Sequence, residues 1–142
     1  MYKIEKSAYG LKITLSEILS SEEALQYKAE LIKAALEQKQ TYSVIFYTQI
    51  LIPFNPEVMK VLEEAYAAVI NSTPNLCRVA VITKSPVVKD QTRRLQHYLQ
   101  VSDIVRIIDV SKYADWEKKA LDWVLSGVEP EVDEPTLVTT KK

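Results

Sequence analysis

The side chains best suited to chemistry gather in one stretch, where hydroxyls and cations surround the start of a predicted helix. Ser85 can cap a helix that begins at Pro86, and the free N–H groups and dipole of a helix start favour an anion. We predict an anion-binding site formed by Thr83, Lys84, Ser85, Lys89 and Arg93. The alternative is that Ser85 only caps the helix, while the basic side chains pair with acids elsewhere.

A second candidate surface lies in the loop 48–57, which follows a predicted strand. Helix starts that follow parallel strands lie at one edge of a sheet, so this loop should neighbour the start of the 85–99 helix. We predict that this face contacts a protein partner through Thr48, Phe54, Asn55 and Ser85. Phe54 has two interpretations, an exposed contact or a hydrophobic staple packed on Val58 and Met59.

The sequence contains no catalytic constellation, and we predict a protein without enzymatic activity, metal or cofactor. Two glycines in the whole chain cannot form a glycine-rich nucleotide-binding loop. The only histidine, His97, lies in a predicted helix without an adjacent nucleophile or orienting carboxylate. A phosphoacceptor site needs acids at strand ends, where Tyr47-Thr48 and Thr83-Lys84 stand instead.

Length and composition indicate one globular domain. The 142 residues are 47% hydrophobic and 26% charged, and the single Cys77, expected in the core, excludes an internal disulfide. Residues 76–106 hold six basic and two acidic residues against a net charge of −1 overall, which is too little positive charge for a nucleic-acid protein. Without a signal-like stretch or about 18 consecutive apolar residues, we expect a cytoplasmic, bacterial-type protein with no membrane span.

Hydrophobic periodicity predicts the element order β-β-α-β-α-β-α-β-α. Period-two alternation on both sides of Gly10 predicts an N-terminal β-hairpin, and the apolar runs 42–47, 76–82 and 105–108 predict buried strands. Strands that alternate with helices imply an α/β fold with a mostly parallel, four- to five-stranded sheet and flanking helices. Pairing of the hairpin edge between two subunits, giving a homodimer, stays open.

Helix boundaries carry recognisable signals. Ser20 and Glu23 form a capping box, Asn55 and Ser85 each precede a proline at a helix start, and Gly127 ends the last helix. In the first helix we expect a buried stripe of Leu25, Ile32, Ala35 and Leu36. Residues 1–127 are therefore predicted to form the domain, and residues 128–142 a flexible acidic tail.

These patterns resemble the STAS domain family (the anti-sigma-factor-antagonist fold), in its SpoIIAA-like branch. The similarity covers about residues 1–127 and rests on the strand 78–82 leading into Ser85-Pro86, then a helix with Arg93 and Leu95. The strand 44–47 with its following loop and helix is similar to a second conserved unit. The family implies a fold of this order and a role in binding protein partners.

The chain departs from the family at the phosphorylation switch. Family members place an Asp-Ser pair and a glycine directly after the strand that corresponds to residues 44–47 here. A partner kinase phosphorylates the serine of that pair. Residues 48–56 contain no serine, no such pair and no glycine. We therefore expect a non-enzymatic, STAS-like regulatory or interaction module that lacks the phosphoacceptor serine. The alternative is a small-molecule or lipid-binding α/β domain with an apolar cavity of several hundred Å³.

Overall fold

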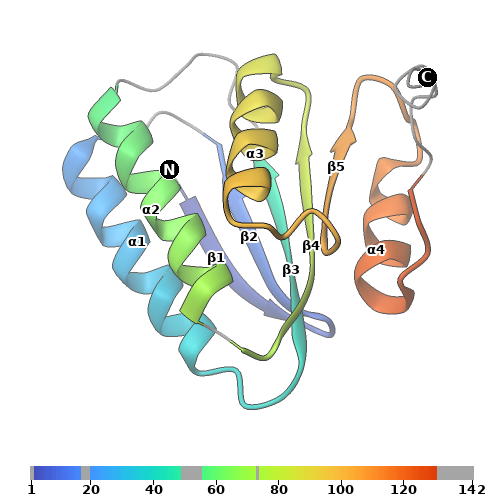
Figure 1. The fold of residues 1–142 in the computed structure, drawn as a ribbon, viewed down its shortest axis with the longest axis horizontal. Helices are drawn as coiled ribbons and strands as arrows, with labels where there is room; N and C mark the ends of the chain where they lie inside the picture. Colours follow the sequence, from blue (N-terminus) through green and yellow to red (C-terminus); the bar gives the residue numbers. More distant parts are fainter. Residues whose placement is uncertain (1, 17–19, 49–55, 73, 131–142) are drawn as a thin grey trace.

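The computed structural model describes residues 2–16, 20–48, 56–72 and 74–130 (Figure 1). Within them the chain forms five strands and four helices in the predicted order: β1 (Tyr2–Ser7), β2 (Gly10–Leu15), α1 (Ser21–Leu36), β3 (Tyr42–Thr48), α2 (Pro56–Ser72), β4 (Leu76–Thr83), α3 (Pro86–Tyr98), β5 (Val105–Asp109) and α4 (Trp116–Ser126). None of the helices in these ranges is long and apolar enough to cross a membrane.

The strands form one mixed sheet whose spatial order, β1-β2-β3-β4-β5, follows the sequence. β1 and β2 pair antiparallel as the predicted hairpin, and every further pair is parallel. The predicted α/β fold with a mostly parallel sheet is therefore confirmed. Because the parallel strands all run the same way, the ends of β3, β4 and β5 meet at a single edge.

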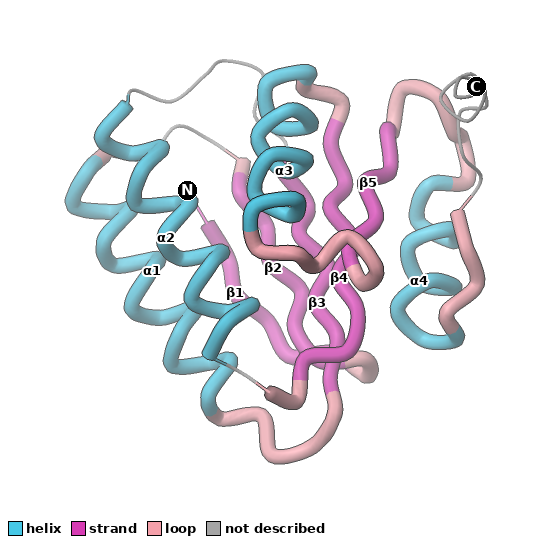
Figure 2. Tube along the Cα trace, in the orientation of Figure 1, coloured by secondary structure: helices cyan, strands magenta, loops and turns pink. Residues whose placement is uncertain are grey.

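Helices cover both faces of the sheet. In β3, Val44 and Phe46 belong to the core beneath α1, α2 and α3, whereas Ile45 and Tyr47 belong to a second core beneath α4. Figure 2 shows α1 and α2 side by side, with α3 further along the sheet and α4 beyond β5. Every residue of β3 is buried, as expected for a strand covered on both faces.

The buried face of α1 differs from the predicted stripe. Leu25 and Leu36 are 55% and 57% exposed, and the buried positions are Ala24, Tyr27, Leu31 and Ala35. Among the buried residues, Tyr27 contacts Tyr2 of β1 edge-on, with 5.2 Å between the ring centroids. Ala35 is buried as predicted, whereas Ala24 and Leu31 take the inward positions expected for Leu25 and Ile32, a difference of one residue that corresponds to about 100° of helix rotation.

The chain after the last helix remains packed on the domain. Gly127 ends α4 in the left-handed conformation with φ of 69°, as predicted, yet Glu129 and Pro130 also contact the domain. Arg106 donates hydrogen bonds to the two carboxylate oxygens of Glu129 at 2.8 and 2.7 Å, and Pro130 is buried. The ordered part therefore extends at least three residues beyond the predicted boundary at 127, and residues 131–142 of the predicted tail lie outside the described ranges.

Arg106 provides a test of this anchoring. Its guanidinium also lies over the ring of Trp123, 4.3 Å from the centroid, so we expect Arg106→Gln to destabilise the protein by about 1–2 kcal/mol. Amide exchange at Val128 and Glu129 should accelerate in the same variant. Urea denaturation and hydrogen exchange measure both effects. Glu129→Gln is the matched control because it keeps the stack on Trp123, and a larger loss in that variant would contradict this account.

Candidate functional site

The carboxyl ends of three neighbouring strands place polar residues at one edge of the sheet. β3 ends at Thr48, β4 at Thr83 and β5 at Asp109, and Thr83 and Asp109 are direct partners in the β4–β5 register. As whole residues, Thr48, Thr83 and Asp109 are only 8%, 1% and 9% exposed. Ligands of open α/β sheets bind outside the carboxyl ends of the strands, so this edge is the first place to look for a site.

The turn from β4 into α3 has the predicted capping geometry. The Ser85 hydroxyl accepts a hydrogen bond from the Val88 N–H at 3.3 Å, and Pro86 occupies the first helical position. The Ser85 N–H in turn donates to the Thr83 Oγ1 at 3.1 Å. Because Ser85 is buried and engaged in these bonds, it offers a partner or an anion little free surface.

Of the other predicted contact residues, Thr48 lies at the edge, while Phe54 and Asn55 lie outside the described residues. The two interpretations of Phe54 therefore stay open. Thr48 and Thr83 do come together as the ends of adjacent strands, since Tyr47 pairs with Ile82 in the β3–β4 register.

Two of the cations predicted to attract an anion are paired within the protein. The Lys89 ammonium forms an ion pair and hydrogen bond with the Asp109 carboxylate, and both side chains are largely buried. The Arg93 guanidinium lies 3.4 Å from Asp90 one turn earlier on the same helix, at an exposed position. This is the pairing with acids that we gave as the alternative, and it leaves Lys84 as the cation of the predicted set that contacts no acid among the described residues.

Asp109 is the site residue that the sequence interpretation missed. That interpretation ended the last strand at Ile108, although an acid directly after an apolar strand is a recognisable signal for a polar strand end. The Asp109 Oδ1 accepts hydrogen bonds from the Ser111 N–H at 2.9 Å and the Ser111 hydroxyl at 2.6 Å. Burial alone raises the pKa of Asp109, but the bonds from Lys89 and Ser111 outweigh it and lower the pKa to about 2.

A pocket of about 360 Å³ opens at this edge on the α4 side of the sheet, and we call it the edge pocket. It is lined by Tyr47, Thr48, Ile82, Thr83, Lys84, Val110 and Trp116. The rings of Tyr47 and Trp116 meet edge-on with centroids 5.7 Å apart. Burial raises the pKa of Tyr47 to about 12, so its hydroxyl stays protonated at neutral pH.

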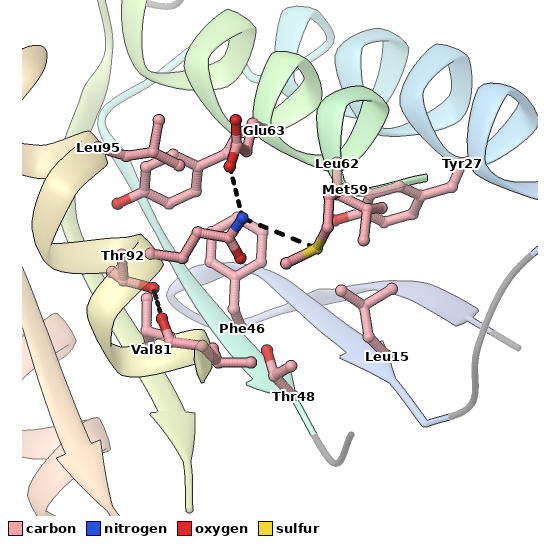
Figure 3. A pocket seen from close by; sticks show the side chains of 13 residues that line it. Leu15, Tyr27, Phe46, Thr48, Met59, Leu62, Glu63, Val81, Thr92 and Leu95 are labelled. Carbon is pink, nitrogen blue, oxygen red and sulfur yellow. Dashed lines mark hydrogen bonds between the residues drawn. The ribbon is translucent and has the colours of Figure 1, made fainter. Parts of the chain in front are cut away.

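A second, smaller cavity lies on the opposite face, between the sheet and α1, α2 and α3 (Figure 3). Its walls are mainly apolar and include Phe46, Met59 and Leu62, and its volume is about 80 Å³. Gln91 of α3 bonds to Glu63 of α2 across it. Pockets for ligands of drug size measure about 300–1,000 Å³, so this cavity is too small for a lipid chain.

Neither protein-family models, nor curated proteins, nor solved structures gave a match to this chain. The resemblance to the STAS family therefore remains a prediction from the sequence.

Proposed function

We propose that this chain is a non-enzymatic, STAS-like interaction module that binds an unidentified protein partner in the cytoplasm through the carboxyl edge of its parallel sheet. The observation that carries the proposal is the edge pocket, with apolar walls and the exposed Lys84 among its lining residues. The absence of a serine from residues 48–56 argues against the phosphorylation switch of the resembled family.

The chemistry of this edge favours an acidic partner surface that inserts an apolar side chain. Lys84 contacts no acid among the described residues, so its charge is available to a carboxylate of the partner. Complementary charge at an interface raises the association rate and selects among partners. An apolar side chain that fills the pocket would contribute most of the affinity, as buried anchors do at protein interfaces.

Affinity capture with the tagged full chain tests this proposal. We expect Lys84→Glu to reduce recovery of the specific partner at least about tenfold, because the substitution places like charges against each other at the contact. The matched control is Lys33→Glu on α1, an exposed lysine in the helix layer on the other face of the sheet. A partner that Lys84→Glu captures as well as the unaltered chain does would contradict the proposed contact face.

Native mass spectrometry of the purified protein complements the capture experiment. It reports the number of subunits together with any retained small molecule, so it separates a homodimer from a hetero-complex. The free edge of the sheet at β1 is where a second copy would pair.

A further inference from the structure

We propose that the edge pocket binds a free small-molecule carboxylate with an apolar or aromatic body. This inference goes beyond the proposed function, because the ligand would occupy the pocket of the isolated protein without any protein partner. It rests on the size of the pocket, on the composition of its walls and on a lysine that no acidic side chain offsets among the described lining residues.

The pocket has the size and walls of a small-ligand site. Its volume of about 360 Å³ falls in the range of about 300–1,000 Å³ that such sites occupy. Ile82 near the end of β4 and Val110 just after β5 supply aliphatic walls, and Trp116 supplies an indole from the first residue of α4. Aromatic side chains in edge-to-face contact, as Tyr47 and Trp116 are, form a rigid wall against which another ring can pack.

Lys84 is the charged side chain among the described residues that line the pocket. The Lys84 ammonium makes no hydrogen bond or ion pair with another described residue. Thr48 follows Phe46 and Thr83 follows Val81 in the strand alternation, so both hydroxyls point to the face opposite α4, where the Thr83 Oγ1 accepts a bond from the Ser85 N–H. None of the described lining residues is acidic, and the neighbouring Asp109 is engaged by Lys89 and Ser111.

This balance selects the charge of the ligand. A cationic ligand would meet Lys84 with no carboxylate among the described lining residues to offset the repulsion, and a neutral ligand would gain nothing from its charge. A carboxylate accepts charge-assisted hydrogen bonds from the ammonium. Its apolar body would then lie against Ile82, Val110 and Trp116, so charge and shape are satisfied together.

A titration of the full chain, followed in assigned ¹H–¹⁵N spectra, tests the inference with three probes of one shape. These are 3-phenylpropionate, its neutral amide 3-phenylpropanamide and the cation 3-phenylpropylamine. We expect the carboxylate to shift the Trp116 indole peak and the Thr83, Lys84 and Val110 amide peaks, with a Kd on the order of 1–10 mM for so small a probe. The amide should bind at least about threefold more weakly, and the amine should not bind.

Two variants separate charge from shape. Lys84→Met should remove the preference for the carboxylate over the amide, whereas the control Lys33→Met on α1 should keep it. Val110→Trp fills the pocket and should abolish binding of both probes. The inference is overturned if the carboxylate and amide bind equally to the unaltered protein, if Lys84→Met keeps the preference, or if the shifted peaks lie away from the pocket. The two proposals can fail separately. If the unaltered protein binds the carboxylate saturably but Lys84→Glu does not change partner capture, the proposed interface is wrong and the ligand site is supported.

Discussion

Replacing Gly10 with alanine is expected to lower the free energy of unfolding by more than about 3 kcal/mol, or to prevent folding. Gly10 begins β2 and lies beside Ser43 of β3, with φ of +144°. A Cβ atom built at this position would stand 2.2 Å from the Ser43 carbonyl oxygen and 2.9 Å from its nitrogen. Both atoms belong to the backbone of a central strand, so the clash can be relieved only by moving the sheet.

Gly127→Ala is the matched control, because it also places a side chain at a positive φ. There the nearest atom to the new Cβ is the Arg78 Nη2 at 2.6 Å, the end of a flexible side chain that can move aside. We expect a loss of about 1 kcal/mol, mainly from the left-handed backbone at φ of +69°. Urea denaturation compares the two variants, and an equal loss in both would disprove the proposed role of the Ser43 contact.

Lys89→Met is expected to destabilise the protein by about 2–3 kcal/mol, the second large effect. The Asp109 carboxylate is 11% exposed and would keep its charge while losing its cation. Removing one partner of a buried pair costs more than the pair contributes, because the remaining charge is left without compensation. Combining Lys89→Met with Asp109→Asn should recover part of the loss, and failure to recover any would show that packing of the lysine stem, rather than charge, is responsible.

The same pair predicts a pH dependence. The pKa of Asp109 is about 2 in the folded protein, below the value of about 3.9 for an unperturbed aspartate. A carboxylate with a lowered pKa stabilises the fold fully above its unfolded pKa, and this contribution disappears as the pH falls through the folded pKa. We therefore expect the free energy of unfolding to fall between about pH 4 and pH 2, more steeply than in Asp109→Asn.

Asp90→Asn is the control for this pH profile. Asp90 pairs with Arg93 at the surface, where its side chain is 73% exposed, and such pairs contribute about 0–1 kcal/mol. Its acid profile should therefore match that of the unaltered protein. If Asp109→Asn kept the full acid sensitivity, the Lys89–Asp109 pair would not be its source.

The features that follow from the sequence are those that depend on neighbouring residues. Ser20 accepts a hydrogen bond from the Glu23 N–H, Ser85 caps α3, and Gly127 ends α4, each where its local signal predicts. The continuous apolar run of β3 likewise indicates a strand buried on both faces, because no other position in an α/β sheet hides every side chain. The order of the elements, and from it the α/β class, can be predicted by placing these local signals one after another along the chain.

Contacts between distant parts of the chain were decided by the tertiary structure alone. Lys89 could have paired with any acid until the β4–β5 register brought Asp109 beside Thr83 at the edge. Tyr47 of β3 and Trp116 of α4 line the same pocket, and Tyr2 of β1 contacts Tyr27 of α1, although the members of each pair are far apart in the sequence. Each arrangement follows from strand register and helix rotation, which are determined by the packing of the whole domain and not by any single segment. Among the residues predicted to bind an anion, Lys89 forms a largely buried ion pair with Asp109, and Lys84 lines the edge pocket.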